Sequence, residues 1–194
     1  SYCGGPILVW NGGQWQTHIG WANTQRVAFH RLRPRRGALC DIPDLELFPA
    51  RYRVRERMEF RAALEVGLAQ QAFAVLAWLR QVGLLKNPSS LAGLLNTTAK
   101  LFDPLGSALG GMVVRVSGLD ADGKPAKRAW HIAADNDHGP EIPCMAAILP
   151  ARRLAGGEPM ASGAYACVGL NKLADFAPEF AKWGMVTDVV EEDA

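Results

Sequence analysis

The sequence predicts an α+β fold, with a mixed or antiparallel sheet covered by helices. Residues 112–134 have the pattern of a long β-hairpin, and residues 65–85 have the spacing of a helix. Strands and helices do not alternate regularly along the chain, as they would in a parallel α/β sheet. Because 194 residues is the usual length of one domain, we expect a single domain over residues 1–194.

Composition and charge narrow the class of protein. The net charge of +2 comes from 21 basic and 19 acidic residues, a balance that argues against a nucleic-acid-binding surface. Residues 26–36 are locally basic, and we expect a solvated loop or an edge strand there. Four separate cysteines form no CxxC pair, and no long apolar span is present. We therefore expect a cytoplasmic protein that contacts neither nucleic acid nor membrane.

The first half of the chain begins with turns and then changes period twice. Residues 1–44 read as short extended pieces separated by glycine turns at CGGP and NGGQW. Residues 51–63 alternate apolar and charged side chains, which predicts one strand with a core face and a solvent face. Residues 65–85 then predict a helix too apolar to lie alone on a surface, so we expect its own sheet or another subunit to cover it.

The next segments predict a second helix and a hairpin. NPSS ends the first helix, with Ser89 or Ser90 as the N-cap of a helix that includes Leu101. Residues 112–118 and 127–134 are expected to pair as strands. The Asp122–Gly123 pair between them is expected to supply the positive backbone dihedrals of the turn.

The last third of the chain is predicted to contain helices and one final strand. Residues 142–157 read as a helix that Pro150 breaks or kinks and that the two glycines at its end terminate. Residues 163–170 read as a short strand or turn. A short helix is expected over residues 173–182, and a last strand over residues 183–190.

The segment HIAADNDHGPEIP, residues 131–143, concentrates polar side chains between a strand and a helix. One interpretation is a divalent metal site. Its ligands would be Asp135, Asp137, His138 and Glu141, with both aspartates on one face of an extended strand. The other is a turn that ends the hairpin, with Glu141 in the first turn of the following helix. His138 could carry a proton or contact a ligand, since loops at strand ends gather binding groups.

Other residues offer weaker signals. Cys144 lies near a helix start, where the dipole favours thiolate, but an inert buried thiol is the expectation. Arg152 and Arg153 could bind a carboxylate or could simply be surface arginines. No GxGxxG, GxxxxGK[ST], GxSxG or HExxH motif is present, so the sequence shows no complete active site and no Rossmann half.

Several motifs together resemble the C-terminal domain of saccharopine dehydrogenase-like oxidoreductases, over almost the whole chain. They are SYCGG, IGWANTQ, GALCDIPDLELFPAR, the strand of residues 110–120, AWHIAADNDHGPEIP and ASGAYACVG. Two motifs depart from the family pattern: CGGPI stands where CGGLP is common, and GWAN where SWSP is common. Saccharopine itself is therefore not carried over as the substrate.

The resemblance implies an α+β substrate-binding and dimerisation domain of a larger NAD(P)-dependent oxidoreductase. NAD or NADP would be held by a nucleotide-binding half that precedes this segment, so no cofactor would bind to this chain and the chain would be inactive alone. The substrate would be a small amino-acid-like or imine-forming molecule, and the protein a homodimer. The candidate substrate-binding residues are Trp21, Asn23, Arg26, His138, Gly139 and Glu141.

In that arrangement the turn around His138 would face a cleft between the two halves, and Trp21, Asn23 and Arg26 would line the other side. The alternative function is a stand-alone binding or assembly module without enzymatic activity, which uses the apolar helix of residues 65–85 as a subunit interface.

Overall fold

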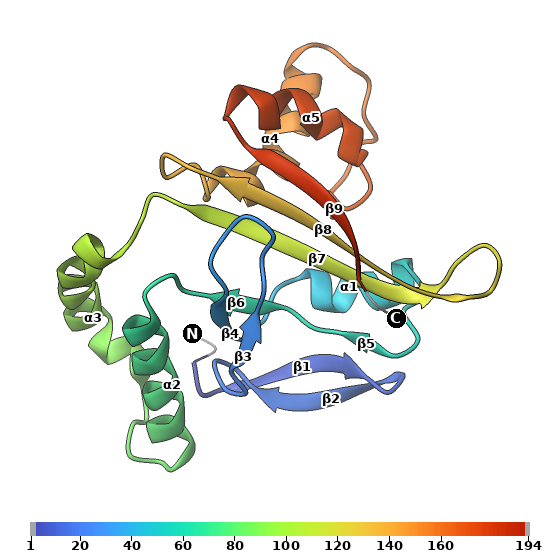
Figure 1. Ribbon diagram of the computed structural model, residues 1–194. Coiled ribbons are helices and arrows are strands. Elements are labelled where there is room, and N and C mark those ends of the chain that lie inside the picture. The colour runs from blue at the N-terminus through green and yellow to red at the C-terminus, as the bar shows by residue number, and fades with distance from the viewer. Residues whose placement is uncertain (1–2, 193–194) are drawn as a thin grey trace. The chain divides into compact units, whose positions relative to one another are not determined.

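The computed structural model has an α+β fold built from three small antiparallel sheets and five α-helices (Figure 1). It describes residues 3–192, apart from the side chains of residues 101–103, so Ser1, Tyr2 and the side chain of Leu101 lie outside the described part. The chain forms two compact units. Unit 1 contains the described residues up to Ala28 together with Pro34–Ser107. Unit 2 contains Phe29–Arg33 and the described residues from Ala108 onward. The expectation of one domain stays a prediction.

Unit 1 contains two three-stranded sheets and the helices between Asp44 and Ala99. One has the order β2-β1-β5, from β1 (Pro6–Asn11), β2 (Gln14–Ile19) and β5 (Arg57–Met58). The other has the order β3-β4-β6, from β3 (Gln25–Val27), β4 (Arg35–Leu39) and β6 (Arg61–Ala63). Alternate side chains of β1 are buried, and Ile7 and Val9 form a small core with Leu39. The expected glycine turn lies between β1 and β2, where Gly12 and Gly13 both have positive φ.

The predicted long strand over residues 51–63 is wrong. Helix α1 (Asp44–Arg51) precedes it, and Arg53 then takes a left-handed φ of 52°. The chain is held by the Trp10 indole Nε1, which donates to the Val54 carbonyl at 2.9 Å, so only two short pieces of this segment pair as strands. The period-two pattern did not reveal the turn at Arg53, because alternation of apolar and charged side chains carries no information about the backbone dihedrals of a single residue.

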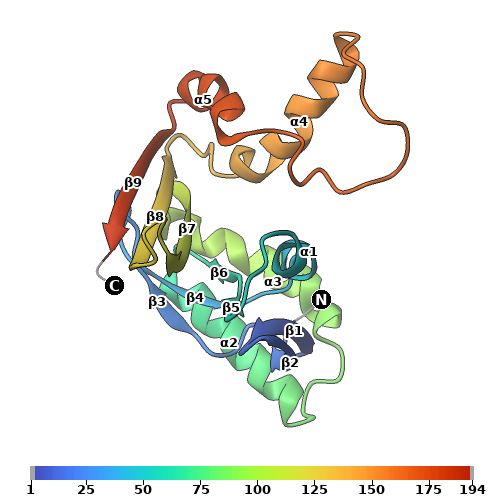
Figure 2. The ribbon, with the colours of Figure 1, turned by 90° about the vertical axis from the view of Figure 1, so that its right-hand side faces the viewer.

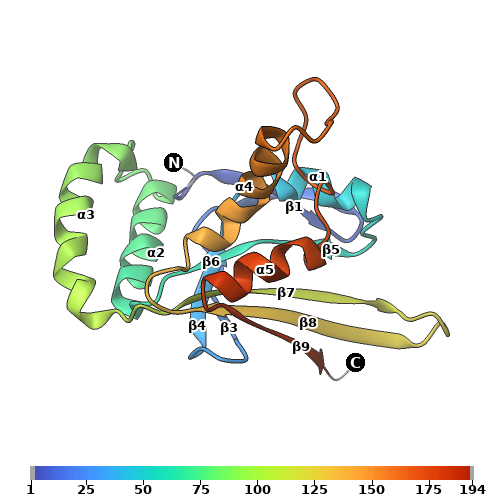
Figure 3. The same ribbon diagram turned by 90° about the horizontal axis from the view of Figure 1, so that it is seen from above.

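The helix predicted over residues 65–85 is confirmed as α2 (Gly67–Gln81), which lies beside α3 (Ala92–Ala99) in Figure 3. The short 3-10 helices η1 (Pro88–Leu91) and η2 (Lys100–Leu105) flank α3. The predicted serine N-cap is wrong: the side chain of Asn87 accepts the hydrogen bond from the Ser89 amide, because Asn87 is the residue with extended backbone before the turn. In α2 only Gln70 and Ala77 are buried.

The predicted hairpin is confirmed as β7 (Gly110–Leu119) and β8 (Pro125–Ala134). With β9 (Val186–Glu192) it forms a three-stranded sheet in unit 2, in the order β7-β8-β9. The role expected of Asp122 is wrong, because of the two turn residues only Gly123 has positive φ, 76°. The Asp120 carboxylate instead accepts hydrogen bonds from the amides of Asp122 and Lys124, which closes the turn.

Helices α4 (Glu141–Ala155) and α5 (Leu173–Lys182) lie on the same side of this sheet (Figure 2). The second matches its predicted bounds. Pro150 is buried within α4 and does not break it, and Gly157 after the helix has a φ of 82°. Residues 163–170 contain no strand, and the turn that was the alternative is present at Val168–Gly169, where the Leu170 amide donates to the Cys167 carbonyl at 3.2 Å. The core between sheet and helices consists of Ile132, Ala134, Ile142, Met145, Phe180 and Met185.

Within residues 3–192, none of the helices combines the length and the apolar character needed to span a bilayer.

Candidate functional site

The candidate site of unit 2 is the turn of residues 135–141, which connects β8 to α4. The strand ends at Ala134, and Asn136 and Asp137 then take left-handed φ values of 49° and 59°. Two adjacent non-glycine residues in this region store strain, which persists only where surrounding contacts impose it. Here the Asp137 amide donates to the Ala108 carbonyl at 3.0 Å, and the His138 amide donates to the Asp135 carbonyl at 2.9 Å. The turn is therefore fixed before any ligand arrives.

Gly139 lies directly against β7. A Cβ atom on Gly110 would be 2.8 Å from the Gly139 Cα, which is too close for any side chain at position 110. Gly139 and Gly110 of the same unit thus approach each other closely through their backbones. This contact sets where the first turn of α4 begins.

Glu141 is the first residue of α4, where its negative charge complements the helix dipole. Its Oε2 atom is buried and has no hydrogen-bond partner among the described residues. A buried acceptor left without a donor costs about 1–3 kcal/mol, and more if it is charged. Glu141 is therefore the side chain of this turn most in need of a donor from elsewhere.

His138 is half-buried and packs edge-on against the Trp183 ring, with 4.8 Å between ring centroids. Its Nδ1 atom lies 3.1 Å from the Trp183 carbonyl oxygen. Since a carbonyl only accepts, Nδ1 carries a proton in this contact, and Nε2 is the acceptor of the neutral ring. The imidazole is therefore fixed in both orientation and tautomer.

The structure does not have the arrangement of side chains that the metal interpretation requires at residues 135–141. The expected extended strand through Asp135 and Asp137 is absent, since Asn136 and Asp137 turn the chain. Among the described residues, no group of three or more His, Cys, Asp or Glu side chains is arranged to hold a metal ion.

The other three candidate residues belong to unit 1. Trp21 has a φ of 64° and stacks on Phe73 of α2, with 4.6 Å between ring centroids. Asn23 has a φ of 51° and is exposed. Arg26 is exposed on β3, where it pairs in register with Arg36, as expected of a basic edge strand. The structure thus gives Trp21 a packing role and leaves two polar side chains accessible.

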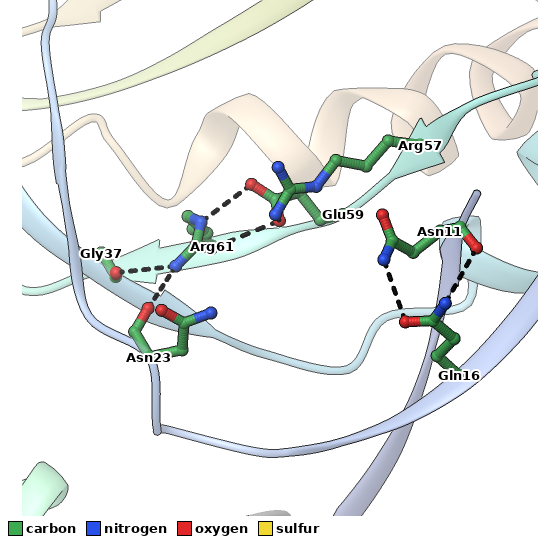
Figure 4. Close-up of polar contacts among 7 residues, drawn as sticks. All are labelled: Asn11, Gln16, Asn23, Gly37, Arg57, Glu59 and Arg61. Atoms are coloured by element: carbon green, nitrogen blue, oxygen red, sulfur yellow. Dashed lines mark hydrogen bonds and ion pairs between the residues drawn. The ribbon is translucent and has the colours of Figure 1, made fainter.

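The carbonyl of Asn23 is held by an arginine (Figure 4). Arg61 donates from Nη1 to the carbonyl oxygens of Asn23 and Gly37, and from its other nitrogens to the Glu59 carboxylate. Glu59 also pairs with Arg57 at 2.8 Å. Since the Arg61 side chain is largely buried, this network fixes the left-handed backbone at Asn23.

Beside Trp21's partner Phe73, unit 1 has a pocket of about 280 Å³ between α2 and α3. It is lined by Cys3, Phe73, Leu76, Pro88, Ser89, Ala92 and Leu95. The Cys3 thiol donates to the Phe73 carbonyl, and burial raises its pKa. The pocket is therefore mainly apolar and lacks a reactive thiolate.

Helix α4 carries Cys144 and the pair Arg152 and Arg153. Cys144 is exposed, so the expected buried thiol is wrong: like its neighbour Pro143 it lies on the exposed face of α4, whereas Met145 fills the core. Arg152 and Arg153 are paired with Glu179 and Glu158. Because both arginines pair with carboxylates of this chain, they are surface arginines and do not form a ready site for a carboxylate ligand.

Sequence reasoning missed a polar cluster in unit 2, formed by His30, Arg31, His131 and Asp188. The alternation of β8 signals that His131 faces away from Ile132. No sequence signal joins Arg31 to Asp188, which is 157 residues away.

No family model matches this chain, and no curated protein matches it either.

Proposed function

We propose that this chain is the substrate-binding and dimerisation domain of a saccharopine dehydrogenase-like NAD(P)-dependent oxidoreductase, with a small amino-acid-like or imine-forming substrate. The proposal joins the sequence resemblance to one structural observation, the unpartnered Oε2 atom of Glu141. An ammonium or iminium N–H is a donor of the kind that this buried carboxylate oxygen lacks.

The surroundings of Glu141 suit a binding role. The strained turn is held by backbone hydrogen bonds, Gly139 is packed against Gly110, and His138 is fixed by Trp183. A turn ordered in advance lowers the entropy cost of binding. His138 Nε2 and the Glu141 carboxylate are the groups that would orient the substrate, once the Glu141 side chain turns so that its buried Oε2 atom is accessible.

The nucleotide would be held elsewhere in the protein. A dinucleotide cradle of the Rossmann kind needs parallel strands joined by a glycine turn to a helix. All strand pairs in the described part of the chain are antiparallel, so these residues do not fit that cofactor. The role of this chain would be to bind and orient the substrate.

Titration of the 194-residue chain with L-glutamate, with L-lysine and, separately, with NADPH tests the proposal. An amino-acid probe should shift the amide resonances of residues 135–141, and Glu141→Gln should weaken that binding at least about tenfold, the effect of 1.4 kcal/mol. Glu191→Gln, on an exposed part of β9, is the matched control and should bind as the wild type does.

Stoichiometric, tight binding of NADPH would contradict the assignment of the cofactor to another segment. Absence of any shift with both amino acids, or equal binding by Glu141→Gln, would remove the substrate role.

A second candidate function, an assembly module without catalysis, is favoured by the exposed face of α2. Leu68, Val75 and Val82 recur every seven residues, and Trp78 adds to the same stripe. These side chains are about half exposed, from 49% to 60%. The only charged residue of α2, Arg80, donates to the Cys3 carbonyl. An uncharged apolar stripe of this kind suits a helix–helix interface.

Light scattering with Trp78→Glu tests this surface. The wild type is expected to be a dimer and the variant a monomer with an unchanged circular dichroism spectrum. Leu119→Glu, at an exposed position of β7, is the control and should remain dimeric. If Trp78→Glu keeps the wild-type mass, α2 is not the interface. A dimer without amino-acid binding would favour the assembly function alone.

A further inference from the structure

One face of the β7-β8-β9 sheet carries the core with α4 and α5, and the opposite face carries His131. This residue is only 7% exposed. In register it lies between Val113 of β7 and Asp188 of β9. Residues outside the sheet must therefore help to cover this histidine.

These residues are the segment Phe29–Arg33, which we call the latch segment. It belongs to unit 2, although the residues on either side of it belong to unit 1. The His30 amide donates to Nδ1 of His131 at 3.3 Å. Arg31 donates from Nε and Nη2 to the two carboxylate oxygens of Asp188, at 2.6 and 2.8 Å. Leu32 is buried, and its Cδ1 occupies the space that a Cβ on Gly111 would need.

The contact from His30 depends on the protonation state of His131. Nδ1 accepts a hydrogen bond only when it carries no proton, so a protonated imidazole would present N–H to N–H. The contact between Arg31 and Asp188 does not change over the same pH range, since neither group titrates near neutrality.

Charges of both signs face His131. Arg115 of β7 and His30 of the latch segment disfavour its protonation, whereas Asp188 and Glu192 of β9 favour it. Each of these acids is itself paired, Asp188 with Arg31 and Glu192 with Arg115. Burial is the largest influence, and it lowers the pKa of His131 below the ordinary value of 6.5.

We propose that the latch segment is a pH-sensitive latch, which neutral His131 holds against the sheet and which protonation of His131 releases. Protonation breaks the hydrogen bond from the His30 amide and adds a positive charge beside Arg115. Release leaves Arg31 and Asp188 to be solvated separately, and it uncovers Gly111 and the His131 face. This device is independent of the proposed enzymatic role.

Amide hydrogen exchange of the full chain tests the latch. Protection factors, which remove the intrinsic effect of pH on exchange, are measured for residues 29–33 at pH 7.5 and at pH 5.0. In the wild type, protection of the His30 amide should fall at least tenfold at the lower pH, while amides paired between β7 and β8 keep theirs. Equal protection of His30 at both values would overturn the proposal.

Two variants separate the causes. His131→Gln retains an acceptor that does not titrate, so protection of His30 should no longer depend on pH. Arg31→Gln changes an exposed side chain and should fold normally, with the latch segment less protected already at pH 7.5. His18→Gln, in β2 of unit 1, is the control and should keep the wild-type response. A pH response retained in His131→Gln would also overturn the proposal.

Discussion

Arg31 and Asp188 form a two-point hydrogen-bonded ion pair between residues 157 positions apart in sequence. The guanidinium matches both carboxylate oxygens, a geometry that fixes orientation as well as charge. It links the latch segment, which lies in the basic stretch of residues 26–36, to β9 near the C-terminal end of the chain. The pair therefore holds residues 29–33, together with the hydrogen bond from the His30 amide to His131.

The first prediction concerns the titration of Asp188. The hydrogen bonds from Arg31 hold the pKa of this carboxyl below its ordinary value of 3.8. In Arg31→Gln the pKa should rise toward that value, as measured from the carboxyl carbon shift during an acid titration. An unchanged Asp188 titration would show that the pair does not persist in solution.

The second prediction concerns stability against pH. Because the folded-state pKa of His131 is lowered, the unfolded chain binds the proton more readily than the folded chain. His131 therefore does not lower the free energy of unfolding above about pH 6.5. As the pH falls from there, His131 lowers the free energy of unfolding progressively, until the pH reaches its folded-state pKa.

Urea unfolding between pH 7.5 and 5.0 measures this effect. The wild type should lose stability on acidification, and His131→Gln should lose less. The other three histidines remain in both proteins, so the difference between the two slopes reports on His131. Identical slopes would contradict the prediction.

The sequence predicted those parts of the fold in which local pattern and tertiary contacts agree. The hairpin β7–β8 and helix α5 were predicted correctly because their apolar side chains recur on the faces that form the core, which include Ile132 of β8 and Phe180 of α5. The alternation at residues 51–63 had no such support. There the left-handed backbone at Arg53, which follows the end of α1, and the contact from Trp10 to Val54 decide the path. The second of these joins residues 44 positions apart, which the alternation does not encode.

The candidate site was predicted in part for the same reason. Glycine, proline and acidic residues after a strand indicate a turn, and the turn at His138 is present. The pairing of His138 with Trp183, the contact of Gly139 with Gly110 and the donor missing at Glu141 depend on packing within unit 2. Periodicity and motif spacing carry no information about such contacts.

The third prediction concerns the four thiols. Cys144 and Cys167 are exposed, whereas Cys3 is 4% exposed and burial raises the pKa of both Cys3 and Cys40. With DTNB at pH 8, two thiols should react rapidly and two at least about tenfold more slowly, since the thiolate is the reacting form. Cys144→Ser should remove one rapid equivalent and Cys3→Ser one slow equivalent. Four rapid equivalents in the folded protein would contradict the burial of Cys3.

The fourth prediction compares two glycines of the same strand. A Cβ on Gly110 would meet the Gly139 backbone at 2.8 Å, whereas a Cβ on Gly118 would have no atom within 4 Å. Gly110→Ala should therefore lower the free energy of unfolding by about 1–3 kcal/mol, as overpacking against backbone does. Gly118→Ala should change it by less than about 0.5 kcal/mol.

The same pair of variants tests whether the turn is built for binding. Because Gly139 cannot move alone, Gly110→Ala should displace residues 135–141 together, with amide shifts confined to that turn and β7. Binding of an amino-acid probe through Glu141 should then weaken, while Gly118→Ala binds as the wild type does. If Gly110→Ala is destabilised but binds the probe normally, the close approach of the two glycines serves packing alone, and the position of Glu141 is set by α4.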